Sequence, residues 1–261
     1  MLLVCDVGNT ETTIGVADAN RIVAHWRVMT SAARTPHEFA LLLRSLLDLD
    51  ELRHHSIHAA AIGSVVPGVT APLADGIRLA FAVAVTIVDA SSPLPITLDV
   101  EEPLTVGADR IINTLAASRL YGRDCIVVDL GTATTYDCIT EDGVFLGGVI
   151  APGVVTSLET LTRRSSKLPA TELRAPVSVL GRRTEECIRS GVVYGAVDAI
   201  TGIVARLRAA WPTGRAPLVI GTGGLAAMLA PLCPVLEVVD ADLTLRGLQI
   251  AHELLTARLT D

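Results

Sequence analysis

The sequence lacks the features by which nucleic-acid-binding, zinc-binding and disulfide-rich proteins are usually recognised. Aromatic residues make up only 3% of its 261 residues, no basic run stands out, and the net charge is −7. Because nucleic-acid binding relies on clustered basic residues and stacking aromatics, no nucleic-acid partner is expected. The five cysteines are scattered without a CxxC pair, which argues against a structural zinc site or a disulfide framework. Cys5, Cys125 and Cys138 lie in apolar runs and are expected to be small core residues.

The chain also lacks a continuous apolar run long enough to cross a bilayer, although its mean hydropathy is +0.51. The longest apolar stretch, residues 79–88, is bounded by Arg78 and Asp89, whereas a membrane-spanning helix needs about 20 residues. The first residues have neither the basic start nor the long apolar region of a signal peptide. We therefore expect a globular, cytoplasmic protein with no membrane partner.

What the chain does contain is one short sequence motif in two copies. Residues 4–10 read VCDVGNT and residues 127–135 read VVDLGTATT, so that Asp6 and Asp129 stand 129 − 6 = 123 positions apart. Each copy is typical of a buried strand, a tight turn and a returning strand. The turn offers a carboxylate for a metal ion, glycine where the backbone must approach a ligand, and donors for phosphate. One such turn alone would usually be an ordinary strand ending, but two copies predict a duplicated domain that binds one nucleotide from both sides.

The rest of the sequence predicts the same plan in each half. One meander of strands is expected over residues 1–28, with a turn at 18–20, and a second meander is expected over residues 125–150. The helices that we expect cover residues 35–49, 69–81, 107–121, 155–162, 184–210, 225–232 and 244–258, and further strands cover 59–66, 84–89, 218–220 and 235–239. A meander followed by alternating helices and strands, occurring twice, is typical of the actin/hexokinase-type architecture. The predicted fold is α/β, with ribonuclease-H-like domains at residues 1–116 and 117–261, each a mixed β-sheet flanked by helices.

The glycine-rich residues 221–224 follow a predicted strand and can hold adenosine against the backbone, but they have a second interpretation. Gly221, Gly223 and Ala226 match a small dinucleotide-binding fingerprint, with Asp240 standing 240 − 221 = 19 residues later. Only 261 − 240 = 21 residues follow, so the other strands of such a fold would have to come from upstream. An NAD site is therefore the weaker interpretation. The sequence contains no Gly-x-x-x-x-Gly-Lys motif, which excludes a P-loop kinase.

Residues 107–110 (GADR) follow a proline-rich loop and begin a predicted helix. Asp109 in the first helical turn can simply stabilise the helix dipole, with Arg110 on the surface. Alternatively, Asp109 accepts a proton from a substrate hydroxyl while Arg110 binds an anionic group through two hydrogen bonds. The residues alone leave both interpretations open.

With these segments in place, the chain resembles type III pantothenate kinases over nearly its whole length. The matching stretches occur in order at residues 6–10 (DVGNT), 64–67 (SVVP), 107–110 (GADR), 129–135 (DLGTATT), 147–153 (GGVIAPG), 167–169 (KLP), 184–191 (TEECIRSG), 222–224 (TGG) and 242–248 (DLTLRGL). The resemblance implies the reaction ATP + pantothenate → ADP + 4′-phosphopantothenate, the first step of coenzyme A biosynthesis.

Individual roles follow from the same resemblance. Asp109 resembles the general base of the family. The residues expected to contact ATP are Asp6, Val7, Gly8, Asn9, Thr10, Glu11, Thr12, Thr13, Thr132 and Gly223. The residues expected to line the pantothenate site are Val100, Gly107, Ala108, Asp109, Arg110 and Thr184. Val100 stands where many members of the family carry Tyr, so the contact that Tyr makes is not implied here.

The resemblance also implies cofactors and a partner. Asp6 is expected near the Mg²⁺ that accompanies ATP, and Asp129 is expected to hold a monovalent cation, K⁺ or NH₄⁺. Thr184 resembles a substrate contact contributed across a dimer interface, which implies that the functional unit is a homodimer.

Three other functions stay open at this point. The chain can be a kinase or phosphatase of the same superfamily that acts on another small molecule, a non-catalytic regulatory relative, or a short filament-forming relative of actin. Loss of Asp109 or of either Asp-x-Gly turn would favour the regulatory alternative, and all are present. Arg163, Arg164 and Lys167 can reach phosphate or a partner subunit, or can belong to a solvated loop, and the sequence does not decide between these.

Overall fold

The computed structural model describes residues 1–19, 21–52 and 56–258, and its contacts divide the chain into two compact units. Unit 1 contains Met1–Leu120, Gly143–Phe145 and the chain from Asp242 onward, and unit 2 contains Tyr121–Asp142 and Leu146–Ala241. The domain division predicted between residues 116 and 117 stays a prediction. By contacts, the C-terminal helix groups with unit 1.

The same strand order occurs in both units. The strands of unit 1 are β1 (Leu2–Val7), β2 (Glu11–Asp18), β3 (Arg21–Met29), β4 (Ala59–Ser64) and β5 (Ala84–Val88), and the order of its sheet is β3-β2-β1-β4-β5. The corresponding strands in the second half of the chain are β7 (Cys125–Leu130), β8 (Ala133–Ile139), β9 (Val144–Pro152), β10 (Leu218–Thr222) and β11 (Val238–Val239), in the order β9-β8-β7-β10-β11. In each sheet the Asp-bearing strand has an antiparallel hairpin partner on one side and a parallel strand on the other. This repetition confirms the expected α/β class of two mixed sheets flanked by helices.

Four helices cover the sheet of unit 1: α1 (Pro36–Leu49), α2 (Pro67–Phe81), α3 (Ala108–Tyr121) and α7 (Leu243–Ala257). The predicted start of α1 is confirmed, because Thr35 and Glu38 form a reciprocal capping box. Of the turn expected at residues 18–20, Asp18 ends β2 and Ala19 lies in a turn, and Asn20 lies outside the described residues. The loop expected over residues 91–106 contains a short strand, β6 (Thr97–Leu98), which pairs in parallel with Val144 and Phe145.

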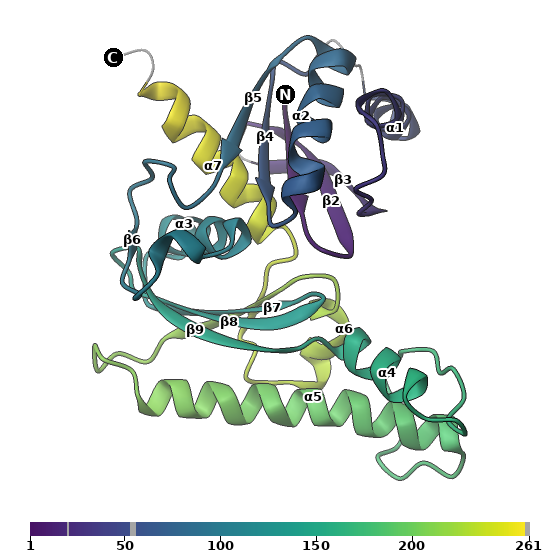
Figure 1. Cartoon of the computed structure of the whole chain (residues 1–261). Coiled ribbons are helices and arrows are strands. Elements are labelled where there is room, and N and C mark those ends of the chain that lie inside the picture. The colour runs from purple at the N-terminus through teal and green to yellow at the C-terminus, as the bar shows by residue number, and fades with distance from the viewer. Residues whose placement is uncertain (20, 53–55, 259–261) are drawn as a thin grey trace. The chain divides into compact units, whose positions relative to one another are not determined.

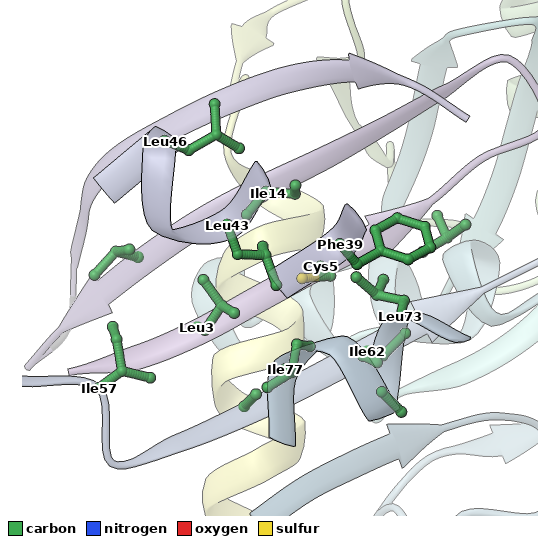
Figure 2. Close-up of a cluster of buried hydrophobic side chains, with 14 of the residues drawn as sticks. Leu3, Cys5, Ile14, Phe39, Leu43, Leu46, Ile57, Ile62, Leu73 and Ile77 are labelled. Atoms are coloured by element: carbon green, nitrogen blue, oxygen red, sulfur yellow. The ribbon is translucent and has the colours of Figure 1, made fainter. Parts of the chain in front are cut away.

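Alternation along β1 divides the core of unit 1 between two faces of the sheet. Figure 2 shows Leu3 and Cys5 of β1 packed among side chains of α1 and α2, including Phe39, Leu43 and Ile77. The intervening β1 residues point to the opposite face, which α3 and α7 cover. The burial of Cys5 confirms that it is a small core residue.

The helices of unit 2 are α4 (Val154–Arg163), α5 (Thr184–Ala209) and the single turn α6 (Ala226–Leu229). The long helix α5 lies along the sheet of this unit (Figure 1), where Val193 and Val197 pack against Ile126 and Val219. Among the described residues, α5 is long and apolar enough to cross a membrane by length and composition alone. This evidence is weak, because the core helix of a soluble protein passes the same test.

Two sequence predictions in unit 2 differ from the structure in extent. The helix expected over residues 225–232 is one α-helical turn followed by a 3-10 turn at Ala230–Leu232, and the strand expected over 235–239 is only β11. Pro231 and Pro234 explain the shortening, because proline donates no backbone hydrogen bond to a helix or a sheet. Cys125 and Cys138 are buried, as predicted.

Candidate functional site

The first predicted phosphate turn connects β1 to β2 and is held from two sides. The Gly8 amide donates a hydrogen bond to the Glu11 carbonyl over 3.0 Å, and a Cβ at Gly8 would lie 2.9 Å from the same oxygen. The Thr30 hydroxyl donates to the Gly8 carbonyl over 2.7 Å. Because the turn closes this tightly, it presents Asn9 and Thr10 to solvent, where a phosphate could reach them.

The residues predicted to contact ATP in this hairpin differ in their exposure. Asp6 is half-buried near the end of β1, and Glu11 is exposed. The Thr12 side chain is only 2% exposed, and its hydroxyl lies 2.9 Å from the hydroxyl of Thr30. The hydroxyl of Thr12 therefore stabilises the hairpin from within, and the exposed side chains of the turn are better placed for a ligand.

Asp109 is brought to the same end of the sheet by two close contacts of α3. Gly63 of β4 is the neighbour of Asp6 across the parallel ladder, and a Cβ at Gly63 would overlap the Ile112 side chain. Glycine at this position thus lets the first turn of α3 lie directly on β4. A Cβ at Gly107 would lie 3.3 Å from Val65 Cγ1, so the GADR segment also packs on the loop that follows β4.

The electrostatic surroundings of Asp109 fit a group that exchanges a proton. Its carboxylate accepts a 2.8 Å hydrogen bond from the Arg110 amide. Burial raises the pKa of Asp109 above its ordinary value, and the Arg110 hydrogen bond and charge oppose that increase. The Arg110 guanidinium carbon lies 5.0 Å from the centre of the Phe145 ring. Arg110 is thus half-buried and held over an aromatic face, rather than extended on the surface.

The second predicted phosphate turn, in unit 2, is buttressed by the start of α4. The Gly131 amide donates to the Ala133 carbonyl over 3.1 Å, which closes the hairpin. The Thr132 carbonyl accepts hydrogen bonds from the Gly153 amide at 3.1 Å and the Thr156 hydroxyl at 2.7 Å. A Cβ at Gly153 would collide with the backbone of Gly131 and Thr132, so only glycine fits there. The side chain of Thr132 is exposed.

The glycine-rich loop after β10 lies against the same turn. Gly223 has a φ of +84°, and a Cβ there would overlap the Asp129 carboxylate and lie 2.7 Å from the Leu130 amide. Thr222 is the neighbour of Asp129 in the parallel β7–β10 ladder. The structure therefore brings together the second Asp-x-Gly turn, Gly153 and Gly223 within unit 2.

Other predicted residues lie on loops or at helix ends. Val100 is half-buried just after Asp99, whose amide donates to the Phe145 carbonyl over 2.9 Å. Thr184 is the exposed first residue of α5. Arg163 is exposed and lies 3.4 Å from Glu159, one helical turn earlier, as in an ordinary surface ion pair. Arg164 and Lys167 are also exposed, and nothing in the structure assigns them a role.

Three residues that pack against the predicted site residues were not predicted from the sequence. Gly63, Phe145 and Gly153 carry no charge or hydroxyl, so nothing about their chemistry marks them. Only Gly153 stood in a noted motif, at residues 147–153, and without a role. Their functions depend on contacts between segments far apart in the sequence, which local pattern does not reveal.

Comparisons with known proteins show one family, and the relatives cover nearly the whole chain. A family model described as type III pantothenate kinase matches residues 2–206. A type III pantothenate kinase of Halalkalibacterium halodurans is 42% identical over 253 residues, which cover 97% of this chain and 99% of that protein. One from Thermomicrobium roseum is 40% identical over 253 residues, covering 97% of each.

Solved structures show the same fold at low sequence identity. The ethanolamine utilization protein EutJ of Carboxydothermus hydrogenoformans aligns with a TM-score of 0.55 at 18% identity, over 94% of this chain and 88% of that one. Component A of the (R)-2-hydroxyglutaryl-CoA dehydratase of Acidaminococcus fermentans aligns with a TM-score of 0.52 at 13% identity, over 100% and 99%. These likenesses concern the fold alone, which is that of the actin/hexokinase-like ATPases.

Proposed function

Since the chain belongs to the type III pantothenate kinase family, which phosphorylates pantothenate with ATP in coenzyme A biosynthesis, we propose that Asp109 is the general base of this reaction. The observation that carries this proposal is the position of Asp109. Its half-buried carboxylate, with a raised pKa, stands at the start of α3, at the end of the sheet where the Asp6 turn also lies. Ligands of open α/β sheets bind at the carboxyl ends of such strands.

The chemistry follows from the nature of phosphoryl transfer. The γ-phosphoryl group passes through a loose transition state, so that positioning and charge neutralisation supply most of the rate. Asp109 would accept the proton of the pantothenate hydroxyl as that oxygen attacks phosphorus, and a positioned base of this kind typically contributes ~10²–10⁴-fold. Arg110, held over Phe145, would bind the pantothenate carboxylate.

In unit 1 the exposed side chains of Asn9 and Thr10 are suited to bind phosphate oxygens of ATP. In unit 2 the exposed Thr132 hydroxyl is suited to the same task, and the Gly223 loop is suited to hold the adenosine. Among the described residues there is no group of three or more His, Cys, Asp or Glu side chains that could hold a metal. This fits Mg²⁺, which commonly binds to one or two carboxylates and the substrate phosphates rather than to a cage of protein ligands. Asp6 would hold it, and the ion would neutralise phosphate charge.

The raised pKa of Asp109 predicts the acid side of the pH profile. The base must be ionised to act, so kcat/KM for pantothenate should fall as the pH drops through the pKa of Asp109. Because burial raises that pKa, the fall should begin at a higher pH than an ordinary aspartate, with a pKa of about 3.9, would give. The measurement is kcat/KM against pH, with circular dichroism to show that the protein stays folded. A flat profile down to the pH of acid unfolding would remove Asp109 from the role.

A monovalent cation is the second proposed cofactor, held by Asp129. This carboxylate lies against the Gly223 loop, where backbone and carboxylate oxygens can supply the ligands that hard cations prefer. We expect the rate of pantothenate phosphorylation to depend on K⁺ or NH₄⁺, and to fall when Na⁺ or tetramethylammonium replaces them at equal ionic strength. An Asp129→Asn variant should lose this dependence. Unchanged activity of the wild-type protein in all four salts would contradict the proposal.

We also propose that the enzyme is a cytoplasmic homodimer that uses Thr184 across the subunit interface. A shallow groove along α5 supports this, because Gly191 and Gly195 face it and no described residue lies within 4 Å of a Cβ built at either position. Ile150, which is 66% exposed, lies on the strand beside it. Sedimentation should give twice the chain mass of 27.4 kDa, and Gly195→Leu should shift the protein toward the monomer and raise KM for pantothenate. A wild-type protein that sediments as a fully active monomer would contradict this proposal.

A further inference from the structure

Residues 242–248 (DLTLRGL), at the start of α7, form one of the stretches that resemble the family, yet they have no part in the mechanism above. In the structure they fasten α7 to unit 1. Leu243 is fully buried, and Leu245 Cδ1 lies 2.9 Å from a Cβ built at Gly15 of β2. Leu248 Cδ2 lies 3.3 Å from a Cβ built at Gly63 of β4. The segment therefore fits closely onto the face of the sheet that also carries α3.

One hydrogen bond joins this segment directly to the helix of the proposed base. The Thr244 hydroxyl donates to Asn113 Oδ1 over 2.8 Å, and both side chains are buried, with 9% and 1% exposed. Asn113 lies on α3 one turn after Asp109. Within the described part of the chain, Nδ2 of Asn113 has no hydrogen-bond partner, so the bond from Thr244 satisfies the Oδ1 side of this buried amide alone.

A close backbone contact lies beside this hydrogen bond. A Cβ at Gly247 would lie 2.6 Å from Ile112 Cγ2 and 2.7 Å from the Ile112 carbonyl oxygen. The same Ile112 side chain rests on Gly63 of β4 on its other side. The first turns of α3 are therefore clamped between β4 and α7, and Asp109 is three residues before the clamped position.

We propose that Thr244 and Gly247 are positioning residues of the kinase, which fix the rotation and height of α3 and thereby place the Asp109 carboxylate. This inference rests on the proposed role of Asp109 as the base. Small displacements of a reacting group are costly, since a misplacement of about 1 Å can lower a rate by ~10²-fold. A purely structural role would instead lower the thermal stability without changing kcat in the folded enzyme.

The first test removes the hydroxyl without changing the shape of the side chain. Thr244→Val should lower kcat by ~10-fold or more at a temperature well below its melting point, while KM for ATP stays near the wild-type value. Thr244→Ser keeps the hydroxyl and should restore kcat. Thr256→Val is the matched control, because among the described residues the Thr256 hydroxyl on the same helix donates only to carbonyls of α7 itself. A wild-type kcat in folded Thr244→Val would overturn the proposal.

The second test uses glycine and does not depend on the first variant folding. Gly247→Ala should push α3 away from α7, lower kcat, and shift the acid limb of the pH profile because the burial of Asp109 changes. Gly76→Ala is its matched control, since a Cβ there would lie 2.6 Å from Phe39 Cβ and 2.8 Å from the Pro36 carbonyl, between α2 and α1. If both variants lose equal stability but only Gly247→Ala loses kcat, positioning is supported. Equal loss of kcat in both would overturn it.

A double-mutant comparison separates this inference from the proposed function. If Thr244 acts through Asp109, then Thr244→Val should lower kcat in the wild-type background and have little further effect in an Asp109→Asn background. If Asp109→Asn is itself nearly as active as wild type, the proposed base is wrong. If Asp109→Asn is inactive but Thr244→Val has wild-type kcat, only the positioning role is wrong.

Discussion

Replacing Asp109 with asparagine is expected to lower kcat for pantothenate phosphorylation by at least about two orders of magnitude. The change keeps the shape of the side chain and its ability to accept the 2.8 Å hydrogen bond from the Arg110 amide. It removes the negative charge of the carboxylate and with it the capacity to accept the proton of the substrate hydroxyl. The measurement is steady-state ADP production with saturating pantothenate and Mg-ATP, and near wild-type turnover would rule out the proposed base.

The same variant should stay folded and should bind ATP as the wild-type protein does. Burial raises the pKa of Asp109 in the folded protein. Its contribution to the free energy of unfolding is therefore present below the unfolded-state pKa and is lost as the pH rises through the folded-state pKa. At pH 7 the neutral asparagine gives up the attraction to Arg110 but avoids the larger cost of burying a charge, so the melting temperature should be equal to or above that of the wild type. Lower stability together with lost ATP binding would mean that Asp109 mainly supports the fold.

Gly223→Ala is the second change from which we expect a large effect, and it should act on ATP rather than on pantothenate. Gly223 has a φ of +84°, where an L-residue costs roughly 1–2 kcal/mol. The new methyl group would also meet the Asp129 carboxylate and the Leu130 backbone. Because each 1.4 kcal/mol is tenfold in affinity, we expect the Kd for ATP to rise by at least about tenfold. Isothermal titration with a non-hydrolysable ATP analogue measures this.

Gly214→Ala is the matched control for Gly223→Ala. Gly214 has a φ of +71°, and a Cβ built there has no atom of the described part of the chain within 4 Å. Its substitution should therefore cost similar backbone strain without the collision that Gly223→Ala adds, while the affinity for ATP stays unchanged. An equal loss of ATP affinity in both variants would show that the effect of Gly223→Ala comes from destabilised folding rather than from the site.

The sequence predicted the elements of this fold well because its signals are local. The repeated Asp-x-Gly motif predicted two hairpins. The structure has them at β1–β2 and β7–β8, and each hairpin has the corresponding neighbouring strands in its sheet. The helix expected over residues 35–49 is α1, which begins at a capping box formed by neighbouring residues in the sequence, Thr35 and Glu38. Proline-rich segments were less well predicted, because a two-residue strand such as β6 has no periodicity to detect.

The arrangement of the site depends on contacts that local pattern does not contain. The helix α7 follows the second half of the chain, so its position in the sequence suggested the second domain. By contacts it groups with unit 1, where Leu245 meets Gly15 of β2 and Gly247 meets Ile112 of α3. The glycines at Gly63 and Gly153 looked like ordinary strand and turn residues. Each is needed because another segment approaches where a Cβ would stand.

The most direct test of the whole account is the production of ADP by the purified protein with Mg-ATP and K⁺, with and without pantothenate, with the product identified by its mass. We predict that ADP release depends on pantothenate and that one product has the mass of phosphopantothenate. ATP binding without pantothenate-dependent turnover would contradict it, and would favour a regulatory relative or a kinase for another small hydroxyl substrate.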